Sequence, residues 1–417
     1  MVPGAARLSA RTSEPSRRNS TTSADGPCRR GLAYAEGRIT RRERRTPLEL
    51  GLSEEQTLLR DAARELLEKE CPESRVRAME SDALGYSPDL WRLMAQQGWM
   101  GLLVPERYGG SGMSFLDLLV LVEEFGRVLL PGPALPTQVA TLALLEAASD
   151  AQKRCYLPAI SAGQSIWTLA FTEPSARFDA EGVDLAARAN GDGFVLNGTK
   201  LFVRDSHVAD RLIVVARTGG RAEDGISLFV VDTTSPGIRQ TPIRTIASDR
   251  QCQVRFENVH VAADALLGDE GGGWPVFQRI ANRATVLECA YLVGLCQRAF
   301  EITLAYTKQR IQFDRVIATF QALQHQATDM ATDMDGARLI TTSAAWALHA
   351  EEPDQDEEVH VAKAWVSAAS QRVVARAQAM HGGIGFTRDY PIQLYFRRQK
   401  ASELAWGDAD HHRELLC

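Results

Sequence analysis

The stretch WPVFQRIANRATVLECAYLVGLCQRAFEITLAYTKQ, residues 274–309, decides the fold class. Apolar side chains recur through it at helical spacing, so the sequence predicts one long helix there. The same periodicity predicts two further helices, over residues 321–351 and 356–380. Helices of this length exceed the usual size and are typical of a long-helix bundle. We therefore expect residues 268–417 to form a C-terminal bundle of the four-helix type.

Before this bundle the pattern changes from helical to strand-like. Residues 193–203 read GFVLNGTKLFV, and the Asn197-Gly198 pair within them predicts two short strands joined by a type I′ turn. Further β-rich runs follow, at residues 212–216, 226–231 and 252–256. The sequence therefore predicts a small antiparallel β domain over residues 165–267.

The residues before the β domain have helical periodicity again. Ser53-Glu54-Glu55-Gln56 fits a capping box, and apolar residues recur at helical spacing over residues 58–67. Helical patterns continue over residues 88–97 and 115–125. We therefore expect an all-helical domain over residues 48–164, and an α+β fold class, mostly α, for the chain.

Residues 1–47 differ from the rest of the chain. They are rich in Arg, Ser and Gly and contain no long apolar periodicity. Such a segment cannot bury enough surface to offset its ordering entropy, so we predict a disordered tail. An organelle transit peptide, also rich in Arg and Ser, is the alternative interpretation.

The composition excludes several classes of protein. The net charge of −6 does not favour nucleic acid as a partner, and no run of 18 apolar residues predicts a membrane span. The seven cysteines form no CxxC pair, so we expect neither a zinc or other metal site nor a redox dithiol. Their odd number, without a signal peptide, predicts a cytoplasmic location.

Four short strings carry the functional signal: Pro105-Glu106-Arg107-Tyr108-Gly109-Gly110-Ser111-Gly112, Thr172-Glu173-Pro174, Arg310-Ile311-Gln312-Phe313 with Phe320-Gln321-Ala322, and His381-Gly382-Gly383-Ile384-Gly385-Phe386. A guanidinium suits a phosphate ligand because it is planar, always charged and bidentate. Glycines allow a backbone to approach a ligand closely. Taken singly, each string has a structural alternative: a turn, a solvated arginine or a glycine helix cap.

In this order the four strings resemble the acyl-CoA dehydrogenase family, from about Ser53 to His412. The resemblance implies a bound FAD, an acyl-CoA thioester as substrate and a homo- or hetero-tetramer that shares FAD between subunits. It implies that Thr172 contacts the flavin ring, whereas Arg310 contacts the pyrophosphate of a neighbouring subunit's FAD. The cofactor-binding residues it implies are Thr172, Arg310, Gln312, Phe313, Phe320, Gln321, His381, Gly382 and Gly383.

The family reaction requires a catalytic base, and this sequence has to supply one. A base removes the α-proton of the acyl group while hydride leaves the β-carbon for flavin N5, and a glutamate in a dry pocket suits that base. The family's two usual base positions correspond to Ala284 and Trp406, and neither side chain can accept a proton. Glu288, one helical turn after Ala284 in an apolar stretch, is the candidate base, and Asp408 is a second.

Two further positions differ from the family pattern, and they suggest an alternative function for the chain. Arg204 stands where the family has a hydroxyl residue near flavin N5, and Phe178 stands where it has a serine. The chain is thus either a complete dehydrogenase with a displaced base or a partner subunit that completes a sister chain's FAD site. Residues 395–414 resemble heteromeric dehydrogenases for bulky steroid thioesters. A flavin-free scaffold is the third interpretation, and electron-transfer flavoprotein is the acceptor that the resemblance implies.

Overall fold

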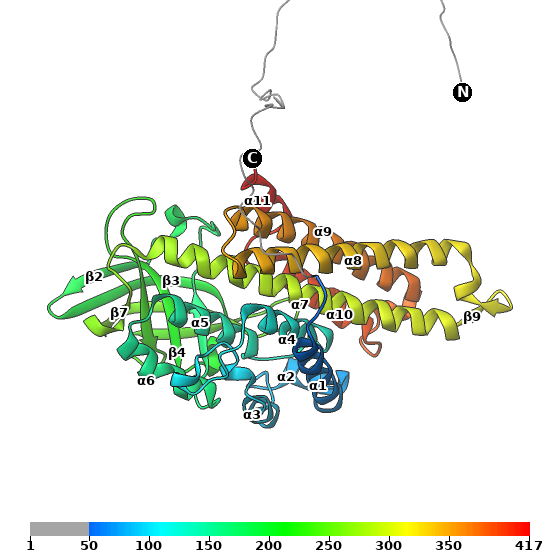
Figure 1. Cartoon of the computed structure of the whole chain (residues 1–417), viewed down its shortest axis with the longest axis horizontal. Helices are drawn as coiled ribbons and strands as arrows, with labels where there is room; N and C mark the ends of the chain where they lie inside the picture. Colours follow the sequence, from blue (N-terminus) through cyan, green and yellow to red (C-terminus); the bar gives the residue numbers. More distant parts are fainter. Residues whose placement is uncertain (1–49) are drawn as a thin grey trace, which may run out of the picture. The chain divides into compact units, whose positions relative to one another are not determined.

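The computed structural model of the chain describes residues 50–417, so the predicted tail, residues 1–47, lies outside the described residues (Figure 1). The helices before the first strand are α1 Glu54–Glu70, α2 Glu73–Ser81, α3 Pro88–Gln96, α4 Phe115–Arg127, α5 Ala134–Ala147 and α6 Asp150–Ser161. The predicted capping box begins α1. The Ser53 hydroxyl accepts a hydrogen bond from the Gln56 N–H at 3.1 Å, and the Gln56 side chain accepts one from the Ser53 N–H.

The middle of the chain forms a sheet of eight strands: β1 Trp167–Ala170, β2 Ala186–Asn190, β3 Gly193–Arg204, β4 Arg211–Arg217, β5 Ile226–Asp232, β6 Ile238–Ile243, β7 Gln251–Ala262 and β8 Leu266–Leu267. The strand order is β6-β7-β3-β2-β4-β5-β8, and β1 pairs with β4. Most pairings in this sheet are antiparallel, as predicted, but the β1–β4 and β2–β4 pairings are parallel. Parallel neighbours require a long connection, and the hairpin of β2 and β3 lies between β1 and β4 in the chain.

The hairpin predicted at Asn197-Gly198 is wrong, because β3 runs straight through this pair. Gly198 has φ +151°, and the register with β7 shifts between Leu196 and Gly198. The glycine therefore serves a bulge, where a Cβ would lie within 3 Å of Leu185. The turn that begins β3 lies instead at Gly191, whose φ is +66°.

The C-terminal helices are α7 Gly273–Gln309, α8 Gln321–His349, α9 Gln355–His381, α10 Ile392–Leu404 and α11 Ala409–Glu414. The three predicted long helices are confirmed to within two residues at each end. Between α7 and α8 the chain forms a small hairpin of β9 Ile311–Gln312 and β10 Arg315–Val316. Figure 1 shows the large sheet at one end of α7 and the β9–β10 hairpin at the opposite end.

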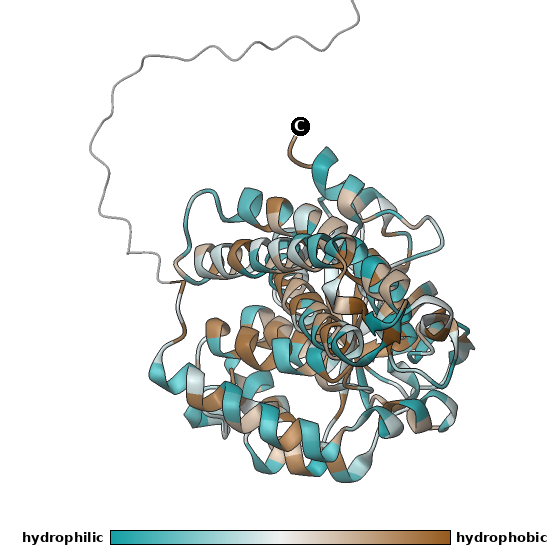
Figure 2. Ribbon diagram, turned by 90° about the vertical axis from the view of Figure 1, so that its right-hand side faces the viewer, coloured by the Kyte–Doolittle hydropathy of each residue, from teal (hydrophilic) through white to brown (hydrophobic). Residues whose placement is uncertain are grey.

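The core of the bundle forms where α7 packs against α4, α8 and α9. Hydrophobic residues are concentrated where the long helices face one another, and hydrophilic residues cover their outer surfaces (Figure 2). The crossing of α4 and α7 is close, because a Cβ at Gly294 would overlap the carbonyl oxygen of Glu123. None of the helices in residues 50–417 is both long and apolar enough to cross a membrane.

Candidate functional site

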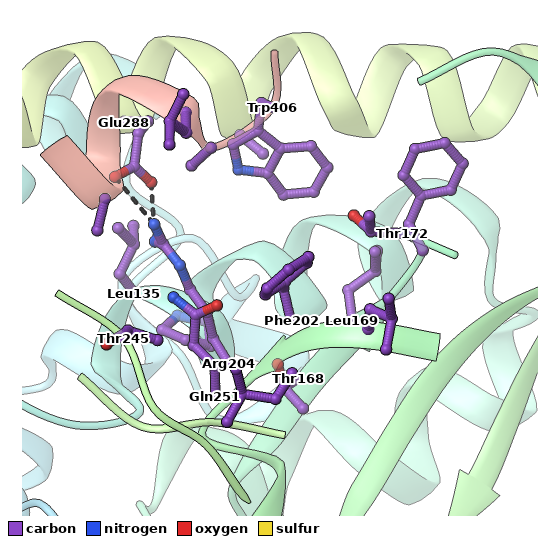
Figure 3. A pocket seen from close by; sticks show the side chains of 18 of the residues that line it. Leu135, Thr168, Leu169, Thr172, Phe202, Arg204, Thr245, Gln251, Glu288 and Trp406 are labelled. Carbon is purple, nitrogen blue, oxygen red and sulfur yellow. Dashed lines mark hydrogen bonds and ion pairs between the residues drawn. The ribbon is translucent and has the colours of Figure 1, made fainter. Parts of the chain in front are cut away.

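A cavity of about 380 Å³ lies between the sheet, α5, α7 and the end of α10 (Figure 3). Most of its lining is apolar and aromatic, and Trp406 and Phe202 project into it from opposite sides. Its polar side chains are few: Thr168, Thr172, Arg204, Arg244, Thr245, Gln251, Glu288 and Lys400. An apolar cavity with a few convergent polar groups is typical of a small-molecule site.

The polar end of the cavity is an ion pair between Arg204, the last residue of β3, and Glu288 on α7. The two guanidinium nitrogens Nη1 and Nη2 donate to the two carboxylate oxygens at 2.9 and 3.2 Å. Glu288 is 1% exposed. Burial alone would lower the pKa of Arg204, but the adjacent Glu288 carboxylate outweighs it and raises that pKa. Both oxygens of Glu288 therefore accept a hydrogen bond from Arg204.

The family's two base positions meet at this cavity. Ala284 and Trp406 both line it, on α7 and after α10 respectively. Trp406 has φ +62°, a conformation that is strained for a bulky residue. Its carbonyl oxygen accepts a hydrogen bond from His412 Nε2 at 2.9 Å, which ties the segment to α11. The cavity thus has no proton acceptor at either position.

Two further carboxylates near Trp406 serve other purposes. Asp408 caps α11, since its side chain accepts a hydrogen bond from the His411 N–H at 2.9 Å. Glu403 accepts hydrogen bonds from Gln399 and Lys400, at 2.9 and 2.8 Å. Neither carboxylate is part of the cavity lining.

A second buried ion pair, which sequence reasoning missed, holds the loop that carries Thr172. Lys200 Nζ donates to Glu173 Oε1 at 2.6 Å and to the Phe171 carbonyl oxygen at 2.9 Å. Burial lowers the pKa of Lys200 to about 8, although Glu173 opposes the shift. The Leu201 N–H also donates to the Thr172 carbonyl oxygen at 2.8 Å, so Thr172 is held at the cavity wall. In the sequence, the signal for this pair was Lys200, a charged residue within a run that has the pattern of a strand.

The arginine string begins at the C-terminal end of α7, where Arg310 is the C-cap residue. Phe313, between β9 and β10, is 87% exposed, and Gln312 and Gln321 are exposed as well. Phe320 packs edge-on against Phe313, with ring centroids 6.1 Å apart. The Arg310 guanidinium is exposed and makes no hydrogen bond or ion pair within residues 50–417. These side chains are free to contact another molecule.

The HGG string lies close to this end as well, because the His381 ring stacks on Tyr306, one helical turn before Arg310. His381 Nδ1 donates to the Ala377 carbonyl oxygen at 2.7 Å, and burial lowers the pKa of the ring. His381 Nε2 and Gln378 Oε1 are buried and have no hydrogen-bond partner within residues 50–417. A buried polar atom without a partner indicates a missing ligand or water.

The glycines of this string leave open space. Gly382 has φ +62°, and a Cβ at Gly382 or Gly383 would meet no atom within 4 Å. With Arg310 and His381 nearby, the residues at this end fit the phosphate-bearing half of a flavin nucleotide. Ala284 and Arg310 are 26 residues apart on or at the end of one helix, about 39 Å at 1.5 Å per residue. The predicted site residues therefore form two separate groups, one beside the first half of α7 and one at its C-terminal end.

Comparison with known proteins identifies the family. Residues 53–164, 168–259 and 271–417 match the models of the acyl-CoA dehydrogenase N-terminal, middle and C-terminal domains. The chain is 31% identical to the probable acyl-CoA dehydrogenase YngJ of Bacillus subtilis, over 88% of this chain and 98% of that protein. It is 29% identical to the acryloyl-CoA reductase (NADH) of Anaerotignum propionicum, over 90% of this chain and 97% of that protein.

Solved structures agree with this result. A variant of the Tcur3481-Tcur3483 steroid ACAD superposes with a TM-score of 0.80 at 33% identity, covering 88% of this chain and 97% of that chain. The ChsE4-ChsE5 complex from Mycobacterium tuberculosis gives 0.81 at 26% identity, with the same coverage. Three domain models in order, and near-complete coverage of these relatives, leave one conclusion: the chain belongs to the acyl-CoA dehydrogenase family, whose members are oxidoreductases.

Proposed function

We propose that this chain serves the FAD-dependent α,β-dehydrogenation of an acyl-CoA thioester as a partner subunit that completes the FAD site of a sister chain. The observation that carries the proposal is the contrast between two places along α7. At its C-terminal end, the Arg310 guanidinium has no partner within the described residues, and Phe313 is 87% exposed. At the larger cavity, 26 residues earlier on the helix, Ala284 and Trp406 occupy the base positions. Two of the similar structures are named after two polypeptides each.

The residues at the hairpin end have separate tasks in this proposal. When bound, the flavin supplies the hydride acceptor of the reaction. The Arg310 guanidinium binds the pyrophosphate of the sister's cofactor, and the space at Gly382 and Gly383 lets that cofactor approach the backbone. His381 Nε2 gains the hydrogen-bond partner that it lacks within residues 50–417. Phe313 loses its exposure by packing against the sister chain or its cofactor.

A second candidate function is favoured by one observation: Glu288 lies in the cavity wall, almost fully buried. In a chain active by itself, the Glu288 carboxylate would leave Arg204 and take the α-proton of the acyl group. A buried carboxylate can act as a general base in a dry pocket. This candidate requires the chain to hold a flavin of its own beside Thr172.

The experiment is to purify the chain alone and after co-expression with a sister chain from a neighbouring gene, and to measure flavin absorbance per chain. We expect flavin only in the co-expressed assembly. Arg310→Met should weaken FAD binding at least about tenfold, because a charge-assisted bond to phosphate is lost. Arg188→Met, an exposed arginine on β2, is the matched control and should leave FAD binding unchanged.

The opposite outcome is equally specific. Full flavin content in the chain alone, with ferrocenium-coupled turnover that Glu288→Gln abolishes while FAD stays bound, would refute the partner role. That result would establish the second candidate. If Arg310→Met left flavin binding unchanged, the partner role would lose its basis.

A further inference from the structure

A second cavity, of about 60 Å³, lies next to the larger one. Its lining includes Asp205, Asp249 and Arg398. Five residues line both cavities: Leu135, Pro136, Arg204, Glu288 and Ala401. The two spaces therefore adjoin, and the residues that they share are the Arg204–Glu288 ion pair and apolar side chains from α5 and α10.

Arg398, on α10, is the unusual group in the smaller cavity. It is 8% exposed, and its Nε is buried without a hydrogen-bond partner within residues 50–417. The guanidinium makes no ion pair with any described carboxylate either. A buried charge without a partner is strongly unfavourable in a folded protein. By contrast, Arg204 and Lys200 each have a carboxylate in direct contact.

The nearest acids do not satisfy Arg398. The charge of Arg398 acts on Asp249. Burial by itself would raise the pKa of Asp249, but that pKa is lowered, and Arg398 contributes most to lowering it. The Asp249 carboxylate is already engaged by Thr245 and by Gln251, the latter at 2.6 Å. Asp205 is 6% exposed and lines the same cavity, and burial raises its pKa to about 7. Arg398 therefore keeps donors that can serve a ligand.

We infer that the two cavities form one binding site for an apolar molecule that ends in a carboxylate. The apolar body lies in the larger cavity, and the carboxylate lies in the smaller one against Arg398. A carboxylate matches the planar guanidinium in bidentate fashion and supplies the negative charge that water cannot. The inference does not depend on the proposed function, because Arg398 lies in a group of residues separate from the hairpin end that is assigned to FAD.

The same chemistry has two sources: a free apolar acid, or the distal carboxylate of a dicarboxylic acyl-CoA. The test is isothermal titration calorimetry of the full-length chain, with its sister chain if that is needed for purification, at pH 7.5. The probes are decanoate against decanol, and decanedioyl-CoA against decanoyl-CoA. We expect the carboxylate member of at least one pair to bind about tenfold or more tightly, since a hydrogen-bonded charge contributes that much.

Arg398→Met should lower the affinity for the carboxylate ligand to the affinity for its neutral counterpart. Arg413→Met, at an exposed side chain on α11, is the control and should preserve the difference. A second measurement guards against misfolding: without ligand, Arg398→Met should raise the thermal midpoint, because it removes an unpaired buried charge. FAD content should not change, which keeps this test distinct from that of the proposed function.

Three outcomes would overturn the inference. Equal affinity within both ligand pairs would mean that the smaller cavity holds water only. A carboxylate preference that survives Arg398→Met would place the carboxylate elsewhere. A thermal midpoint that falls in Arg398→Met, with ligand preference unchanged, would make Arg398 a structural residue.

Discussion

Two charged side chains, Arg204 and the buried Glu288, form the polar end of the larger cavity. The sequence allowed Glu288 to be selected, because an acid interrupts an apolar helical stretch there. It did not allow Arg204 to be recognised as its partner, since the two are 84 residues apart and lie on different elements. The pairing depends on how β3 ends against α7, which no local pattern encodes. Glu288 therefore stays a prediction as a base, and its position in the cavity wall is what the structure adds.

Asp205 gives a prediction that depends on pH. Its pKa is raised from 3.8 to about 7, mainly by burial and further by Asp249. The folded state therefore holds a proton that the unfolded state releases, and this contribution to stability is lost as pH rises from about 4 to about 7. Asp205→Asn should remove that dependence and be more stable than the wild type at pH 8, by at most about 4 kcal/mol.

The check is the free energy of unfolding of both proteins, from urea titrations at several pH values. Near pH 4 the two values should converge, because Asp205 is then protonated in the folded protein. A difference that stays constant across this range would show that Asp205 does not titrate as described.

At the scale of elements, local periodicity predicted the long helices well and the strand connections poorly. The helices succeed because their apolar spacing is repeated over many turns. The Asn197-Gly198 signal failed because the same residue pair suits a tight turn and a bulge, and the close approach of Leu185 decides between them. The parallel pairing of β1 with β4 depends on non-local contacts in the same way.

The β-bulge at Gly198 gives a prediction about stability, for which Gly191 provides the control. Gly198→Ala should destabilise the protein by about 2–4 kcal/mol, because its φ of +151° is open only to glycine and the added Cβ would collide with Leu185. Gly191→Ala adds strain alone, since a Cβ there meets nothing within 4 Å, and should lower the stability by about 1 kcal/mol. Urea denaturation of both variants tests the order. Equal losses would mean that Leu185 moves aside freely.

Across the whole molecule, the four strings predicted the family and the order of domains, and three matching domain models confirm the family. They could not show that the site residues divide into two groups, because that division depends on the length of α7 in space. Thr172 and Glu288 gather at the larger cavity, whereas Arg310 and His381 gather at the hairpin end.

The exposure of Phe313 gives a prediction for the assembled protein. Phe313→Ser should leave the thermal midpoint of the isolated chain unchanged, because the ring is 87% exposed. In the co-expressed assembly it should lower the flavin content, because the hairpin then loses its apolar contact with the sister chain or its cofactor. Leu58→Ser, on α1 at a position that is 71% exposed, is the control. Unchanged flavin content in Phe313→Ser would exclude the hairpin from the interface.

The length of α7 has a consequence for how such a chain evolves. Under the partner role proposed above, substitutions at the cavity after a gene duplication would leave the hairpin end intact, so each copy could discard the site that its twin retains. Once both copies had done so, neither gene could be lost without the other becoming useless. The separation along the helix would thereby turn two redundant paralogues into an obligate pair.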